Sequence, residues 1–279
     1  MSRLHRRGVG TVLGLNRRNL DLVRVLNPPA AIRRADDKLV TKAAMAAAGV
    51  RVAATLAAIR DRRDVRSLDW SALPEGFVLK PVRGARGAGI LVVKPGDDGG
   101  RRGGRVVDDG ALRRHALGLL DRDGRGGAFV EMLLSSSQVI PGAGGHGLAD
   151  VRVLVVEGRA RQAMLRLPTA QSGGRANLHQ GAVGVGVDVS SGRTAGAVHG
   201  GRVVTAHPDS GVELGGRVIG DWQLVVEVAV RAAIASELGY AGIDVAIDDR
   251  LGPVVLEVNA RPGLAIQLAN RRGLLDGGT

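Results

Sequence analysis

The sequence predicts a fold that contains both β-hairpins and α-helices, on the evidence of two kinds of local pattern. Pairs of strands with alternating apolar residues, joined by short turns, occupy residues 149–169 and 240–259. Amphipathic helices with capping residues at their ends occupy residues 35–49 and 221–239. The chain has 279 residues, of which 44% are hydrophobic, so it is long enough for one large domain or two modest lobes.

The N-terminal part is predicted to be largely helical. Residues 1–35 are expected to form a partly helical arm. Residues 35–49, ADDKLVTKAAMAAAG, are expected to form a helix with Asp36 as its N-cap. Lys38 and Lys42 then lie one turn apart on the same helix face. We expect Lys42 to face solvent.

Residues 77–93, FVLKPVRGARGAGILVV, predict a strand, a glycine-rich loop and a second strand. Alternation places Lys80 as the one charged group on an otherwise apolar strand. Because only four of the 39 basic residues are lysine, Lys80 and Lys38 stand out from the surface arginines. The loop contains Arg86 and Gly87 and has free backbone amides that suit phosphate oxygens, although an ordinary turn is the alternative.

The middle of the chain carries polar residues on or beside apolar strands. Residues 128–134 predict a buried strand that includes Glu131. The hairpin at 149–169 is expected to turn at Glu157-Gly158-Arg159 and places Arg152 within a strand. A polar, glycine-rich segment at 170–188 adds three hydrogen-bonding candidates, Arg175, Asn177 and His179.

The C-terminal hairpin brings acidic and amide groups together. Residues 240–249, YAGIDVAIDD, pair with the following strand, VVLEVN, so that Asp244 faces Glu257 at a cross-strand spacing of about 5 Å. Alternation places Asn259 and Val255 on the same face as Glu257. Carboxylate and amide oxygens suit Mg²⁺. A polar face turned to water is the alternative, and a register slip of one residue would separate these groups.

Composition excludes several kinds of protein. The absence of cysteine excludes disulfides, thiolate metal sites and a cysteine nucleophile. No apolar run reaches the roughly 18 residues of a membrane helix, and the N-terminus is a poor signal peptide, so we expect a cytoplasmic location and no membrane partner. The net charge of +12 favours a nucleic-acid-binding protein as the main rival, but aromatic residues make up only 2% and the basic residues are scattered.

The order of these motifs resembles the ATP-grasp superfamily. The resemblance rests on Lys38 in an early helix, on LKPVRGARGAGI, on Glu131 at the end of a strand, and on GIDVAID followed by VVLEVNARPG. The segments DVRVLVVEGRARQAMLRLPT, SGGRANLHQGAVGVGVD and NARPGLAIQLAN look like the alpha-L-glutamate ligase-like branch of RimK-type enzymes. The similarity covers about residues 10 to 275.

This resemblance implies a fold and a domain organisation. It implies an ATP-grasp fold, with two α+β lobes and ATP sandwiched between their sheets. Residues 1–35 would form the arm, 36–130 the small lobe, and 131–279 the large lobe with the metal site. ATP-grasp enzymes often carry a separate domain before the nucleotide lobes, and only 35 residues precede Asp36 here. The resemblance therefore supports ATP chemistry better than it supports glutamate as substrate.

The resemblance also assigns the site residues by position. The nucleotide would be held by Lys38 and Lys80 at its phosphates, by Glu131 at its adenosine part, and by Arg86 and Gly87 of the glycine-rich loop. The Mg²⁺ would be held by Asp244, Glu257 and Asn259. The transferred phosphate or the acceptor would face Arg152, Arg175, Asn177, His179 and Arg261.

The implied activity is that of an ATP-dependent carboxylate-amine ligase, with ATP and Mg²⁺ as cofactors. A carboxylate attacks the γ-phosphate of ATP to give an acyl phosphate, and an amine then displaces phosphate to form an amide. Glutamate, another amino acid or a peptide would be the substrate. Two alternatives remain open: a basic nucleic-acid-binding protein, and a module that binds ATP without turnover.

Overall fold

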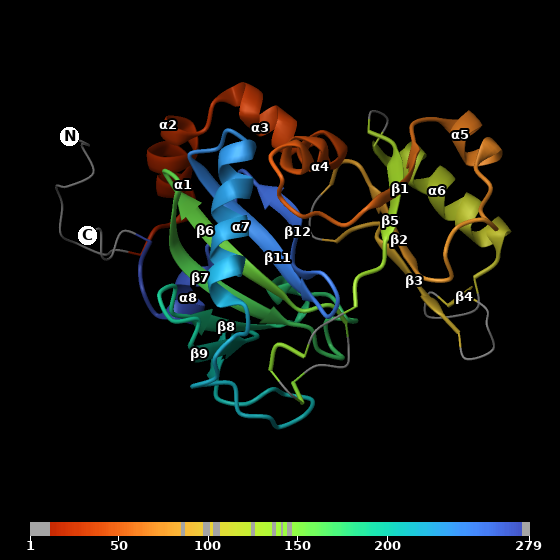
Figure 1. The fold of residues 1–279 in the computed structure, drawn as a ribbon. Helices are drawn as coiled ribbons and strands as arrows, with labels where there is room; N and C mark the ends of the chain where they lie inside the picture. Colours follow the sequence, from red (N-terminus) through yellow and green to blue (C-terminus); the bar gives the residue numbers. More distant parts are fainter. Residues whose placement is uncertain are drawn as a thin grey trace.

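Two antiparallel sheets lie side by side in the computed structural model, each covered by helices (Figure 1). No helix in the part of the chain that the structure describes is long and apolar enough to cross a membrane. The structure describes residues 12–84, 87–96, 101–102, 107–123, 126–135, 138–140, 142–143 and 147–274.

Short helices at the N-terminus pack on the larger sheet. Leu13, Leu22 and Val23 are buried against Leu154 and Met164 of that sheet. These helices are α1 (Leu15–Arg18), the π-helix η2 (Asn19–Val23), α2 (Arg24–Leu26), α3 (Pro29–Ala35) and α4 (Lys38–Ala47).

The N-cap of α4 is Asp37, whose carboxylate accepts a hydrogen bond from the backbone N–H of Val40 at 3.1 Å. The prediction of Asp36 as the cap was therefore one residue off. Asp36 itself has helical backbone angles, because it is the C-cap of α3. Its side chain is thus placed at the end of the preceding helix and not at the start of α4.

The smaller sheet has the strand order β1-β5-β2-β3-β4. Phe77 and Leu79 point into a core that Leu112 and Leu119 of the covering helix α6 complete. Alternation therefore leaves Lys80 on the opposite face, as predicted. The elements are β1 (Thr55–Ile59), α5 (Arg62–Ser67), β2 (Phe77–Pro81), β3 (Leu91–Pro95), β4 (Arg101–Arg102), α6 (Asp109–Asp123) and β5 (Ala128–Met132).

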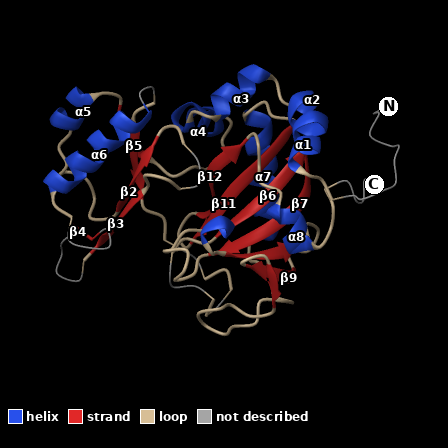
Figure 2. Ribbon diagram, turned by 180° about the vertical axis from the view of Figure 1, so that it is seen from behind, coloured by secondary structure: helices blue, strands red, loops and turns tan. Residues whose placement is uncertain are grey.

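The larger sheet has the strand order β10-β9-β8-β7-β6-β11-β12. Its elements are β6 (Asp150–Val156), β7 (Arg159–Leu167), the 3-10 helix η3 (Leu178–Gln180), β8 (Val183–Val187), β9 (Thr194–His199), β10 (Arg202–Val204), α7 (Trp222–Ala235), β11 (Tyr240–Asp248), β12 (Gly252–Asn259) and α8 (Ala265–Asn270). Helix α7 covers one face and α8 the other, as the opposite views of Figures 1 and 2 show. The predicted turn of the hairpin between β6 and β7 is confirmed, and Glu157 and Gly158 both have positive φ there.

The hairpin of β11 and β12 has the predicted register near its open end, where Asp244 pairs with Glu257. The register then shifts, so that Val245 pairs with Val255 and Leu256 is the extra residue of a bulge. Val255 consequently lies in the core beneath α7, and the prediction that it shares a face with Glu257 is wrong. Strict alternation fails here because a bulge places two successive residues on one side of the strand.

Helix α4 contacts both halves of the molecule. Met45 belongs to the core of the larger sheet. Lys42 pairs with Glu131 on β5 of the smaller sheet, and the backbone N–H of Lys38 donates to Val82 O just after β2. The domain boundaries predicted after residues 35 and 130 stay a prediction, and α4 joins the two sheets across the first of them.

The two ends of the described chain are hydrogen-bonded to each other. The backbone N–H of Leu13 donates to Oε1 of Gln267 at 2.8 Å, and Nε2 of Gln267 donates to Leu13 O at 3.0 Å. The side chain of Gln267 is buried, so this pair of bonds is shielded from water. It fixes the start of the N-terminal helices against α8.

Candidate functional site

A buried carboxylate lies between two lysines where the sheets meet. Glu131 on β5 is only 4% exposed. One of its oxygens is 2.6 Å from Nζ of Lys42, and the other contacts Nζ of Lys80. Burial alone would raise the pKa of Glu131, but the two lysines outweigh it and lower the pKa. The carboxylate is therefore held in its ionised form.

The prediction that Lys42 faces solvent is wrong, since this residue is 6% exposed. Its ammonium lies 5.1 Å from the centre of the Phe129 ring, within the range of a cation–π contact. Burial lowers the pKa of Lys42, and the charge of Glu131 opposes that effect. No local pattern reveals this burial, because the partner carboxylate is 89 residues away in sequence.

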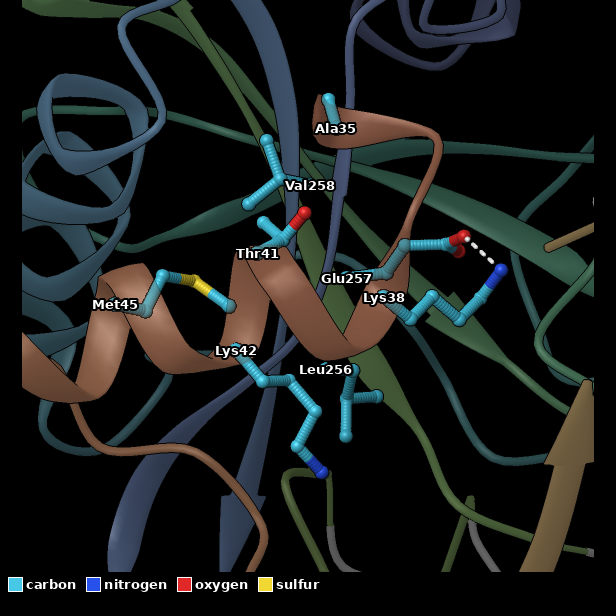
Figure 3. Close-up of a pocket in the computed structure, with 8 residues that line it drawn as sticks. All are labelled: Ala35, Lys38, Thr41, Lys42, Met45, Leu256, Glu257 and Val258. Atoms are coloured by element: carbon cyan, nitrogen blue, oxygen red, sulfur yellow. Dashed lines mark ion pairs between the residues drawn. The ribbon is translucent and has the colours of Figure 1, made fainter. Parts of the chain in front are cut away.

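Lys38 leaves the same helix in another direction. Its Nζ donates to Gly84 O at 2.8 Å and lies 3.3 Å from Oε1 of Glu257. Figure 3 shows this pair, with the ammonium of Lys42 pointing away from it. A cavity of about 10 Å³, room for about one water, lies between α4 and β12. Gly84 has φ +124°, a conformation that side chains rarely adopt, so the glycine allows its carbonyl to reach Lys38.

Beside this pair, four side chains alternate in charge, three of them buried and Arg152 partly buried. Arg152 on β6 donates from Nε and Nη2 to the two oxygens of Asp244, both at 2.7 Å. Nη2 of Arg166 on β7 lies 2.7 Å from Oδ2 of the same carboxylate. Arg166 also donates to Asp150 from Nε at 2.5 Å and Nη2 at 2.6 Å. Bidentate pairs of this kind fix the guanidinium planes.

Burial and neighbouring charge act differently on the two acids of this cluster. Burial would raise the pKa of Asp244, but Arg152 and Arg166 lower it. For Asp150 burial prevails over Arg166 and, with the nearby charge of Asp244, raises its pKa to about 6. Sequence reasoning missed Asp150 and Arg166. The signal was available for Arg166, which is the one charge in the apolar second half of β7, residues 163–167.

The predicted metal ligands fit a hard cation in part. Glu257 lies across from Asp244, and Nδ2 of Asn259 is 3.4 Å from Oδ2 of Asp244. Glu257 has 33% of its side chain exposed, whereas both oxygens of Asp244 already accept from arginines. Among the described residues no three His, Cys, Asp or Glu side chains form a metal cluster, so an amide such as Asn259 would have to contribute. Glu257 and Asn259 suit Mg²⁺ better than Asp244 does.

The glycine-rich loop meets the polar segment 170–188 at one point. A methyl group built on Gly87 would lie 3.5 Å from Cδ of Arg175, so these two residues are neighbours. The structure therefore brings Arg175 to the loop between β2 and β3. Arg86, the other residue predicted from this loop, lies outside the described residues.

Three other predicted residues make local contacts. Oδ1 of Asn177 caps η3 by accepting from the backbone N–H of His179 at 3.0 Å. His179 is exposed. Nη1 of Arg261 is 3.8 Å from Oδ1 of Asp36, and about half of the Arg261 side chain is exposed. The functional roles of these residues stay predictions.

N-terminal side chains brace the turn that follows β12. Nδ2 of Asn27 donates to Tyr240 O at 2.8 Å and to Ala260 O at 3.1 Å, while its Oδ1 accepts from the Tyr240 N–H at 2.8 Å. Nη1 of Arg18 donates to Pro262 O at 2.7 Å. Both side chains are buried. They hold the backbone on either side of Arg261, a contribution that the sequence did not reveal.

The sequence comparisons agree with this architecture. A family model described as sugar-transfer associated ATP-grasp matches residues 17–277. A probable alpha-L-glutamate ligase of Xanthomonas oryzae pv. oryzae is 30% identical over 240 residues, which are 85% of this chain and 61% of that protein. The protein of the same description from Mannheimia succiniciproducens is 27% identical over 86% of this chain and 60% of its own length. The chain thus spans about three fifths of the curated relatives that it matches.

Solved structures give the same result for the fold. A biotin carboxylase complex with β-γ-ATP from Campylobacter jejuni has a TM-score of 0.53 and 16% identity, over 86% of this chain and 43% of that one. A D-cycloserine synthetase has a TM-score of 0.51 and 16% identity, over 89% of this chain and 69% of that one. At these identities the likeness shows the fold alone, and the predicted α+β fold is confirmed.

Proposed function

This chain belongs to the sugar-transfer associated ATP-grasp family, and on that premise we propose that it is an ATP-dependent carboxylate-amine ligase. The predicted membership of the ATP-grasp superfamily is confirmed. One observation carries the proposal further. Lys38 and Lys80 lie on different sides of the junction between the sheets, and each contacts a carboxylate there, Glu257 and Glu131. Two cations beside a glycine-rich loop suit the phosphates of a nucleotide.

In this proposal the nucleotide phosphates bind Lys38, Lys80 and the backbone of the glycine-rich loop between β2 and β3. Glu257 and Asn259 would hold the Mg²⁺ that accompanies ATP, and the metal when bound would supply charge that offsets the phosphates. Asp244 would become a third Mg²⁺ ligand only if Arg152 or Arg166 released one oxygen of the Asp244 carboxylate.

Basic side chains around this site would assist the transfer of the phosphoryl group and the formation of the amide. A substrate carboxylate attacks the γ-phosphate, giving an acyl phosphate and ADP, and an amine then displaces phosphate to form an amide. Arg152 and Arg175 would stabilise the charge on the transferred phosphoryl group, and Arg261 would bind the acceptor. Arg152 suits this role because Asp244 fixes its guanidinium plane. Asn177 and His179 would contact the acceptor as well.

The substrate would be an amino acid or a short peptide in the cytoplasm. The name of the curated relatives points to glutamate as the first compound to test.

A screen of ADP release tests the proposal. Wild-type protein with ATP and Mg²⁺ is incubated with single amino acids, pairs of amino acids and short peptides, and ADP is measured. We expect ADP release to require both a carboxylate and an amine. The Lys80→Ala variant should show no ADP release, and the Lys94→Ala variant should release ADP as the wild type does. Lys94 is exposed on β3 and serves as the matched control.

Two results would overturn the proposal in different ways. Nucleotide binding without turnover in any mixture would identify a binding module. Binding to duplex DNA or RNA that falls steeply with salt, without any nucleotide binding, would identify a nucleic-acid-binding protein, the reading that the net charge of +12 favours.

A further inference from the structure

We propose that Lys42 is a positioning residue that keeps Glu131 paired when Lys80 leaves it for a nucleotide phosphate. The inference rests on the proposed function, because it concerns the same nucleotide site. It assigns a role to a lysine that neither the sequence patterns nor the family resemblance singles out. The role is indirect, since Lys42 acts on the nucleotide only through Glu131.

The first observation is a charge count. Lys42 and Lys80 contact different oxygens of Glu131, and all three side chains are largely buried. Two ammonium groups on one carboxylate leave one positive charge without a partner of opposite sign within this trio. Surplus charge in a poorly solvated place is costly unless an anion offsets it. A phosphate group is such an anion.

The second observation is that the two lysines are not equivalent. Lys42 lies over the Phe129 ring and comes from α4, whose Met45 is anchored in the core of the larger sheet. Lys80 is near the end of β2, four residues before Gly84 and the glycine-rich loop. Of the two, Lys80 is less buried, and it precedes the glycine-rich loop to which we assign the phosphates. Lys80 is therefore the lysine that can move from Glu131 to a nucleotide phosphate.

The consequence for binding follows from the cost of an unpaired buried charge. If Glu131 had Lys80 as its only partner, moving Lys80 onto a phosphate would leave a carboxylate that is 4% exposed without a cation. Breaking a buried pair in this way is strongly unfavourable. With Lys42 held at 2.6 Å, Glu131 keeps one partner throughout. Lys42 thus lowers the free-energy cost of transferring Lys80 to the nucleotide.

The test measures the dissociation constant of Mg²⁺-ATP by calorimetry for four proteins: wild type, Lys42→Met, Glu131→Gln and the double variant. We expect Lys42→Met to weaken binding at least tenfold, because Glu131 then retains Lys80. We expect the double variant to bind within threefold of Glu131→Gln, because no carboxylate remains for Lys42 to hold. Lys94→Met is the control and should bind as the wild type does.

The outcomes separate the competing roles. Direct contact of Lys42 with the nucleotide predicts a similar loss when Lys42→Met is added to Glu131→Gln, which would overturn the proposal. Unchanged affinity in a folded Lys42→Met variant would overturn it as well. If Lys42→Met alone does not fold, the comparison of Glu131→Gln with the double variant still decides. Failure of the wild type to bind Mg²⁺-ATP would instead refute the proposed function.

Discussion

Asp244 and Glu257 face each other across β11 and β12, yet each is neutralised by different cations. Asp244 is buried between the guanidinium groups of Arg152 and Arg166, whereas Glu257 is one-third exposed and meets the ammonium of Lys38. The repulsion expected between two facing carboxylates is therefore already offset by the protein. A bound cation is not required for them to coexist, and Glu257 is the one that a cation from solvent can reach.

Glu257→Gln should leave the fold intact and reduce ADP release by at least a hundredfold. The fold is spared because Glu257 is partly exposed, and such positions change stability by about 0.5 kcal/mol or less. Activity is lost because Mg²⁺ contributes several kcal/mol of charge stabilisation in such reactions. Melting temperature and ADP release, each with and without Mg²⁺-ATP, check this. Wild-type turnover in the variant would refute the metal assignment.

Asp244→Asn should destabilise the protein by about 3 kcal/mol, because it leaves Arg152 and Arg166 with one carboxylate between them in a buried place. Urea denaturation measures the change. The control is Asp121→Asn, which removes the partner of Arg62 from a pair that is more than half exposed on both sides. That change should cost less than about 1 kcal/mol. Equal effects would mean that the buried cluster is solvated in solution.

Tyr240 should titrate near pH 12 in the folded protein, because burial raises its pKa to about 12. The unfolded chain loses this proton near pH 10. Below pH 10 the hydroxyl is neutral in both states, and the contribution of Tyr240 to the free energy of unfolding is fully present. The free energy of unfolding then falls as the pH rises from 10 toward 12, because the unfolded chain loses the proton first. Tyr240 is the only tyrosine in the chain, so tyrosinate absorbance follows it alone. A native midpoint near 10 would show that the ring reaches solvent.

Tyr240→Phe provides the companion measurement. The hydroxyl of Tyr240 is buried and has no hydrogen-bond partner in the described structure. Its removal should leave stability at neutral pH equal to or above that of the wild type, because an unsatisfied polar group is lost. The fall in the free energy of unfolding between pH 10 and 12 should also disappear. A clear loss of stability at neutral pH would reveal a partner for the hydroxyl.

Asn27→Ala should destabilise the protein by about 3 kcal/mol, because three buried backbone groups of Tyr240 and Ala260 lose their partner. Asn16→Ala is the matched control. Asn16 is exposed within α1, so its replacement should change stability by about 0.5 kcal/mol or less. Thermal or urea unfolding of both variants decides. A small effect for Asn27→Ala would mean that water replaces the side chain.

The strands and the cross-strand pair at the site could be predicted from the sequence, because alternation is a local property. Lys80 was found as a lone charge in an apolar strand. The pairing of Asp244 with Glu257 was predicted from a short turn, and it holds because the bulge at Leu256 offsets a turn that is one residue shorter than expected, with Asp248 paired to Gly252. The bulge at Leu256 could not be predicted. An inserted residue leaves no local mark in a run of apolar side chains.

The partners of charged residues were the other part that the sequence could not supply. The burial of Lys42 depends on Glu131, and the neutralisation of Asp244 depends on Arg152 and Arg166, which lie on two other strands. Only the tertiary fold brings these residues, which are far apart in sequence, into contact. Charge pairing across sheets is therefore the feature that a reading of periodicity misses.

The contact between Leu13 and Gln267 makes this molecule a candidate for circular permutation. A permuted chain that links residue 274 to residue 12 needs only a short linker, because Oε1 of Gln267 accepts hydrogen bonds from the backbone N–H groups of both Leu13 and Leu274. New ends could be placed at Gly200 and Gly201, an exposed turn between β9 and β10. In such a chain every element of the site would stay on an uninterrupted segment. The order of the helices and strands along the polypeptide would change while the architecture is preserved.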